Sequence, residues 1–288
     1  MSLDYLAIVL ASSLSNVSIL IISTIGLAII FGLMGVINLA HGEFIMFGAY
    51  SALVITKTGV PFPIAVLLAT LLTALFGAIV EKLIISRLYG RILDTMLATW
   101  GLSMVMYEAA ILIFGTVTPG IGLPQSTLSI GSYSISTYLL MMIPTAIILM
   151  FGAYYLLTKT KYGVMSRASI ADSATSSAMG IETKRLNTIT FTLGSGLAGF
   201  AGAVLLPIVS ATPNMGLAFV VKSFLIVVVA GPLALSGTAA TALSLGMVSN
   251  TVSSFYSSVI GDIIFFTITV ILLRFFPLGI SNKWKFKL

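Results

Sequence analysis

The sequence has no cysteine and a single histidine, and Asp, Glu, Lys and Arg together make up only 8% of its 288 residues. Without cysteine the chain can form neither a disulfide framework nor a cysteine-ligated metal site. Soluble domains average about 25% charged residues, so these few charges could not cover a water-soluble globule. The 58% share of hydrophobic residues also excludes a disordered chain. With a mean hydropathy of +1.15, the composition indicates a protein that crosses the membrane several times.

Basic residues are also unevenly distributed. No Lys or Arg precedes Lys57, and most of the others fall within 82–91, 159–185 and 283–287. This clustering follows the positive-inside rule, which places such segments in the cytoplasm. It does not indicate nucleic-acid binding, which needs a contiguous basic face. We therefore expect a multi-pass protein of the inner (plasma) membrane, with its N-terminus outside and its C-terminus in the cytoplasm.

Long uncharged runs define the expected fold, an all-α polytopic bundle of eight or nine spans. A membrane helix takes about 20 apolar residues, and the whole chain, 1–288, is expected to form one transmembrane domain. The second segment is too short for a full span, so we expect a broken or half-length helix near residues 35–56. Residues 115–136 are rich in Gly, Pro, Ser and Thr and predict an external loop. The expected segments are 6–33, 43–55, 61–85, 93–114, 137–158, 187–209, 219–230, 237–255 and 261–276.

The segment 35–48 places Asn38, His41 and Glu43 inside an otherwise apolar region. Ionisable groups within a membrane usually face the protein interior or a water-filled cavity, so these residues are candidates for a translocation path. The alternative is that they cap the next helix, with Glu43 in its first turn, where the helix dipole favours an acid. One histidine without the His-Glu-x-x-His spacing does not indicate a metal site. No nucleophile elbow accompanies His41, so a catalytic triad is not indicated either.

A second motif consists of small residues. Gly194, Ala198 and Gly202 recur at four-residue steps and therefore share one helix face. Small residues at this spacing let membrane helices approach closely, so the motif predicts tight packing. A place for Ser195 on the translocation path is the alternative.

The long polar segment, about 159–186, is expected on the cytoplasmic side. Its Ala-rich part is compatible with a short helix followed by a turn at Gly180. An ordinary solvated linker would have the same composition.

Three stretches carry a family resemblance: Asn-Leu-Ala-His-Gly-Glu at 38–43, Arg167 with the Ala-rich run ending in Ala-Met-Gly-Ile at 178–181, and residues 187–199. Together they resemble the permeases of ABC importers for branched-chain amino acids and urea, over about residues 32–229. The resemblance implies a second related permease, two cytoplasmic ATPase subunits and an external solute-binding protein as partners, with lipid around the chain. It also implies that the polar segment docks on an ATPase through Arg167, Ala171, Asp172, Ala178, Met179, Gly180 and Ile181. The chain lacks the Gly-x-x-x-x-Gly-Lys-Ser/Thr loop, so ATP and Mg²⁺ are expected on the partner subunits, with no cofactor in this chain and no enzyme activity of its own.

The substrate prediction rests on residues 93–103. Their Leu-Ala-Thr-Trp-Gly run is similar to the urea branch, which makes urea or a short-chain amide the expected substrate. Thr99 and Trp100 could then line the path, although Trp100 could equally be an interface or packing residue. Lys222 departs from the urea branch towards the amino-acid branch, and Pro232 is expected to break its helix. Branched-chain amino acids are therefore the alternative substrate.

The polar residues also bear on two other function classes. A self-sufficient channel or proton-coupled transporter would use His41 and Glu43 as a relay. An intramembrane enzyme would need a nucleophile with a base, or a metal cluster, and the sequence shows neither pattern.

Overall fold

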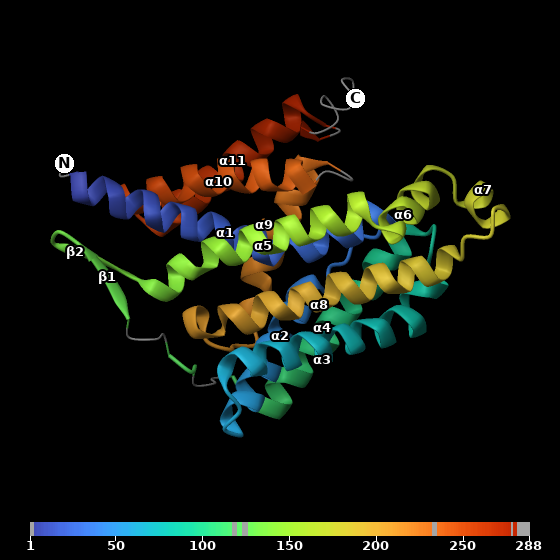
Figure 1. Cartoon of the computed structure of the whole chain (residues 1–288), viewed down its shortest axis with the longest axis horizontal. Helices are drawn as coiled ribbons and strands as arrows, with labels where there is room; N and C mark the ends of the chain where they lie inside the picture. Colours follow the sequence, from blue (N-terminus) through green and yellow to red (C-terminus); the bar gives the residue numbers. More distant parts are fainter. Residues whose placement is uncertain (1–2, 117–119, 123–125, 232–234, 278, 281–288) are drawn as a thin grey trace.

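The computed structural model describes residues 3–116, 120–122, 126–231, 235–277 and 279–280, which form a helical bundle (Figure 1). Each of the nine predicted hydrophobic segments corresponds to a helix. These helices are α1 (Leu3–Met34), α2 (His41–Lys57), α3 (Phe62–Leu83), α4 (Ile92–Phe114), α5 (Thr137–Lys159), α8 (Thr183–Val209), α9 (Met215–Ala230), α10 (Leu235–Phe255) and α11 (Ser258–Phe275). Two short helices, α6 (Lys161–Ala171) and α7 (Ser173–Ala178), form the polar segment, and a 3-10 turn, η1 (Ile85–Arg87), follows α3.

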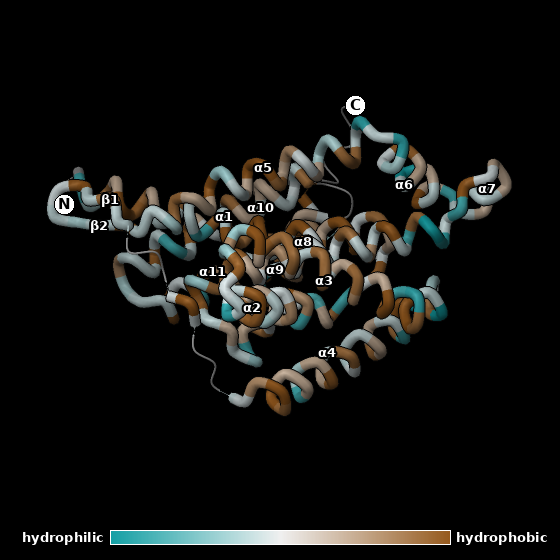
Figure 2. Tube along the Cα trace, turned by 60° about the horizontal axis from the view of Figure 1, so that its bottom comes forward, coloured by the Kyte–Doolittle hydropathy of each residue, from teal (hydrophilic) through white to brown (hydrophobic). Residues whose placement is uncertain are grey.

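Six of the described helices are long and apolar enough to cross a membrane: α1, α3, α4, α5, α8 and α11. The most apolar parts of α1 and α8 are 72% and 67% buried, against 17% for α4, α5 and α11. Figure 2 shows the spanning helices as mainly hydrophobic, with hydrophilic stretches towards α6 and α7. The buried core is therefore built around α1 and α8, and the other spans cover them.

The chain makes the same interruption twice. Helix α1 ends at Gly35, whose φ of 64° is left-handed and suits glycine, and the short α2 begins after an irregular segment. Helix α8 ends at Ser210, which has φ 63°, and the short α9 follows. The predicted broken helix near 35–56 is confirmed, with the break at 35–40. The second break, at 210–214, falls between the predicted segments 187–209 and 219–230.

Glycines allow the short helices to enter the core. A Cβ atom added to Gly42 in α2 would lie 2.4 Å from the carbonyl oxygen of Gly216 in α9. One added to Gly48 would lie 2.2 Å from the carbonyl oxygen of Gly199 in α8. The backbones are thus in direct contact, and Gly202 makes a similar contact with the backbone of α2. The close packing predicted from the small-residue motif is confirmed.

A short β-hairpin accompanies the predicted all-α bundle. Within the stretch expected as an external loop, β1 (Thr127–Ile130) pairs antiparallel with β2 (Tyr133–Ser136), and Leu128 lies opposite Ile135. Polar and apolar residues alternate along both strands around a turn at Gly131, which has φ 59°. The hairpin and the start of α1 lie at the opposite end of the molecule from α6 and α7 (Figure 1). This separation agrees with an external and a cytoplasmic loop, while the orientation of the two ends stays a prediction.

Two sequence predictions fall outside the described residues. They are the helix break expected at Pro232 and the basic tail 283–287.

Candidate functional site

The break before α2 is held by Asn38, which lies in the break itself, and by Thr99 of α4. The Leu39 backbone N–H donates to the Thr99 hydroxyl of α4 at 3.2 Å, and the Ala40 N–H donates to the Asn38 side-chain oxygen at 3.1 Å. Asn38 and Thr99 are both buried. Because unpaired backbone groups are costly in the membrane, these bonds explain how the chain can leave the helix there. Two of the predicted path residues are thus brought together, and both serve the backbone.

His41 and Glu43 lie in the first turn of α2 and point to different neighbours. The His41 Nε2 atom is 2.8 Å from the backbone oxygen of Ser23 in the middle of α1 and so donates to it. The Glu43 carboxylate hydrogen-bonds the Ser103 hydroxyl of α4. Both side chains are buried, as is that of Asn38. Each of the three has one polar atom without a hydrogen-bond partner among the described residues: Nδ1 of His41, Oε2 of Glu43 and Nδ2 of Asn38. No side-chain hydrogen bond caps α2 in the described part of the chain, so the region combines support of the irregular backbone with hydrogen-bonding capacity that the fold leaves unused.

The remaining path candidates lie elsewhere. Trp100 is 52% exposed on the outside of α4, away from the break that its neighbour Thr99 contacts. Ser195 is fully buried, its hydroxyl bonds the Phe191 carbonyl of its own helix at 2.8 Å, and its side chain packs against Gly77 of α3. The structure thus places Ser195 in a helix–helix contact and Trp100 on the exposed surface of α4.

The segment predicted to dock on an ATPase projects from one end of the bundle as α6 and α7 (Figure 1). Asp172 caps α7, its carboxylate accepting from the Ala174 and Thr175 N–H groups at 2.9 and 3.0 Å. The bonds from Thr175 lower the pKa of Asp172, so its charge is stabilised at the positive end of the helix. Ile181 is half-buried, and the other six predicted docking residues are exposed: Arg167, Ala171, Asp172, Ala178, Met179 and Gly180.

Two contacts that the sequence did not reveal tie α6 to spanning helices. Arg167 donates to the backbone oxygen of Leu157 near the end of α5. The Tyr162 hydroxyl lies 2.6 Å from that of Thr190 in α8. Thr190 itself donates to the Leu186 carbonyl at 2.7 Å, so Tyr162 must be the donor in their bond. Burial raises the pKa of Tyr162 and keeps that proton in place.

A groove lies beside these contacts, between α6 and the start of α8. It has a volume of about 400 Å³ and is lined by apolar side chains. Its lining also includes the acidic Glu182, in the turn after α7, and the basic Arg185, at the start of α8. Its lining residues are Met165, Gly180, Ile181, Glu182, Arg185, Leu186 and Ile189.

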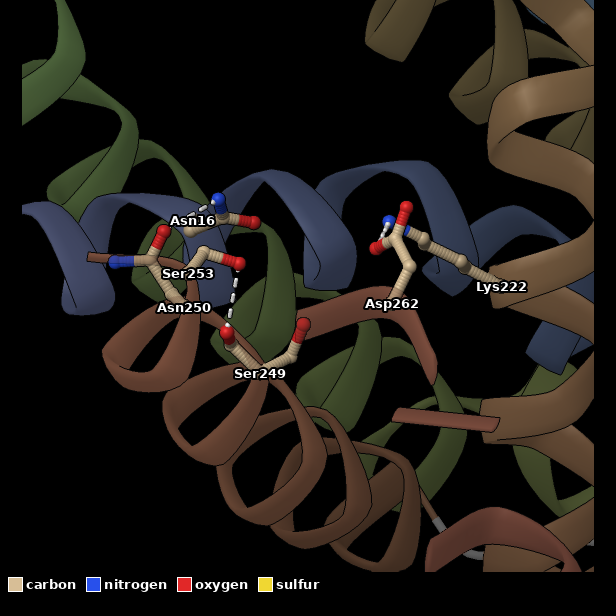
Figure 3. A network of polar contacts seen from close by, with 6 residues as sticks. All are labelled: Asn16, Lys222, Ser249, Asn250, Ser253 and Asp262. Atoms are coloured by element: carbon tan, nitrogen blue, oxygen red, sulfur yellow. Dashed lines mark hydrogen bonds and ion pairs between the residues drawn. The ribbon is translucent and has the colours of Figure 1, made fainter. Parts of the chain in front are cut away.

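Lys222, noted in the sequence as a departure from the urea branch, pairs with an acid. Its Nζ atom is 2.7 Å from the carboxylate of Asp262 in α11, and both side chains are partly exposed (Figure 3). In the same view, Asn16 of α1 donates to the side-chain oxygen of Asn250 in α10 at 3.0 Å. Lys222 and Asp262 are 40 positions apart, and Asn16 and Asn250 are 234 positions apart, so neither pair could be predicted from spacing in the sequence. The ion pair ties α9 to α11, and the bond between the two asparagines ties α1 to α10.

A buried carboxylate lies at the end of α3. Glu81 is 1% exposed and accepts a hydrogen bond from the Tyr89 hydroxyl, in the turn before α4. Burial, with the neighbouring Glu81, raises the pKa of Tyr89 and keeps it a donor. This pair fixes the turn from α3 to α4, a role that the sequence did not indicate.

Comparison with known proteins gives one family and several relatives. Residues 9–273 match the family described as "Branched-chain amino acid transport system / permease component". The chain is 26% identical to the high-affinity branched-chain amino acid transport system permease protein BraD of Pseudomonas aeruginosa, covering 90% of each chain. It is 25% identical to a probable branched-chain amino acid transport permease protein, LivH of Methanocaldococcus jannaschii, over 93% of this chain and 90% of that protein. The corresponding LivH of Escherichia coli K12 is 24% identical over 90% of each chain. No solved structure matches the chain.

Replacing Thr99 by Val tests the support of the break. The part-buried Leu39 N–H would lose its acceptor, and leaving a buried donor unpaired costs about 1–3 kcal/mol. The matched control is Thr73→Val in α3, because Thr73 is equally buried and its hydroxyl bonds the Ala69 carbonyl of its own helix. We expect Thr99→Val to lower the thermal unfolding midpoint in detergent clearly more than Thr73→Val. Equal shifts would contradict a special role for Thr99.

Proposed function

This chain belongs to the family of branched-chain amino acid transport permeases, and we propose that it is the membrane subunit through which an ATP-driven importer moves branched-chain amino acids. The observation that carries the proposal is the family match over residues 9–273. The relatives BraD and LivH are named for branched-chain amino acid transport, and the similarity to them extends over nearly the whole length of each chain. These relatives are transport permease subunits and not enzymes. They favour branched-chain amino acids over the urea or short amide expected from residues 93–103.

The chemistry near the break supports an amino acid as well. Helices α2 and α9 meet at their first turns, at Gly42 and Gly216, so two positive dipole ends converge inside the bundle. Transporters use such half-helix ends to receive a substrate carboxylate. The unpartnered polar atoms of Asn38, His41 and Glu43 lie on the same segment and could serve a zwitterion. Urea, being neutral, would gain less from this arrangement.

The polar segment supplies the link to ATP. We propose that exposed α7, with Met179 at its end, contacts an ATPase subunit and that α6 passes the movement on. Arg167 connects α6 to the end of α5, and Tyr162 connects it to α8. Because α8 forms the core with α1, movement of α6 would reach the break region through packed helices. A second permease and an external solute-binding protein complete the proposed importer.

Uptake by the reconstituted importer tests the function. An assembly purified through a tag on this chain should take up radiolabelled leucine into liposomes only with ATP, and excess urea should not compete. Uptake of labelled urea in place of leucine would overturn the substrate assignment. Leucine uptake by this chain alone, without ATPase subunits, would instead support a self-sufficient transporter.

Variants of Thr190 test the transmission through α6. Thr190→Val removes the acceptor of the Tyr162 hydroxyl, whereas Thr190→Ser keeps it. We expect Thr190→Val to lower the ratio of leucine uptake to ATP hydrolysis several-fold and Thr190→Ser to keep most of it. Tyr162→Phe should resemble Thr190→Val, and Tyr155→Phe, on the exposed surface of α5, should behave as the wild type. An unchanged ratio in Thr190→Val and Tyr162→Phe would exclude this contact from coupling.

A further inference from the structure

Helix α4, like α5 and α11, is little buried. Its most apolar part is 17% buried, and among the described helices it contacts α2 most. The buried face includes Thr99, which bonds the break. At 100° per residue, Glu108 lies nine positions on and therefore about 180° away, on the face that points from the bundle. Glu108 is exposed there, within a spanning helix.

An exposed carboxylate on this face does not suit lipid. Glu108 lies six residues before the end of α4 at Phe114, so it is about 9 Å inside the helix end. Among the described residues Glu108 has no ion-pair partner. Ionisable side chains in spanning helices normally face protein or water, because their transfer to hydrocarbon is costly. The observation indicates that something other than lipid covers this face.

Gly101 provides a second, independent observation on the same face. It precedes Glu108 by seven positions, which is about two helical turns, and it is exposed. A Cβ atom added to Gly101 would meet nothing within 4 Å, whereas one added to Gly26, Gly48 or Gly202 would meet another backbone within 2.3 Å. Glycine inside a helix is unfavourable unless a close contact requires it. Contacts among the residues that the structure describes give no such reason for Gly101.

We propose that the α4 face carrying Gly101 and Glu108 is the contact surface for a spanning helix of the second permease subunit, an inference that rests on the proposed function. Gly101 lies near the middle of α4, between Ile92 and Phe114, at a depth that soluble ATPase and binding-protein subunits do not reach. The other chain's backbone approaches at Gly101, as helices do at the glycines of the core. A hydrogen-bond donor or basic side chain of that helix faces Glu108. Trp100, beside this face, adds an exposed aromatic surface to the contact.

Cross-linking can test this surface, because the chain has no native cysteine. The test variant is Glu108→Cys. The control is Ile148→Cys, because Ile148 is 70% exposed on the outside of α5. Each variant is labelled with benzophenone maleimide in the purified importer and irradiated. We expect Glu108→Cys to give at least five-fold more permease–permease product, identified by mass spectrometry, than Ile148→Cys. Equal yields, or products only with lipid, an ATPase or the binding protein, would overturn the proposal.

Substitution of Glu108 gives a second readout. Leucine is compatible with lipid. If Glu108 faced lipid, Glu108→Leu would therefore leave the recovery of the second permease unchanged. We expect Glu108→Leu to lower that recovery several-fold on purification through this chain, and Glu108→Gln, which still hydrogen-bonds, to keep most of it. Full recovery with Glu108→Leu would contradict the contact. ATP-driven leucine uptake by the unmodified importer shows separately whether the proposed function holds.

Discussion

Direct contact between helix backbones, at positions where glycine leaves no side chain, is the interaction on which the rest of this structure depends. Apolar side chains gain little by leaving lipid for a protein interior, so close packing has to hold the helices together. The contacts of Gly42 with Gly216 and of Gly48 with Gly199 bring the two short helices against each other and against α8. Any side chain at these positions would push the helices apart.

Close packing of the short helices in turn makes the chain breaks possible. Helix α2 can start in the middle of the bundle only because Thr99 and Asn38 satisfy the backbone that leads to it. Helix α9 is tied to the middle of α1 through Ser223, whose hydroxyl is 3.1 Å from that of Thr24. Two helix starts therefore meet at the centre of the protein. In the proposed function, movement arriving through α6 would act on this closely packed centre.

The sequence predicted the parts that depend on local composition. Hydrophobic length located all nine helical segments, and the spacing of Gly194, Ala198 and Gly202 correctly indicated a packing surface. The polar run before Glu43 correctly located the broken helix. These features are encoded by neighbouring residues, so no knowledge of the fold was needed to find them.

Features that depend on distant partners were missed. The bond between Tyr162 and Thr190 joins residues 28 positions apart, and that between Asn16 and Asn250 joins residues 234 apart. Thr99 and Trp100 are neighbours in the Leu-Ala-Thr-Trp-Gly run, but one step along a helix turns a side chain by 100°, so Thr99 is buried and Trp100 is exposed. The hairpin was taken for a loop because its strands are only four residues long.

A disulfide between α1 and α9 would test the central arrangement most directly. The account predicts that the double variant Thr24→Cys, Ser223→Cys forms an intramolecular disulfide on mild oxidation in the membrane, visible as a reducible shift on a gel. The pair Ser129→Cys, Ser223→Cys should not, since Ser129 lies in the hairpin at one end of the molecule. Failure of the first pair to close, or equal closure of both, would contradict the placement of α9 against the middle of α1.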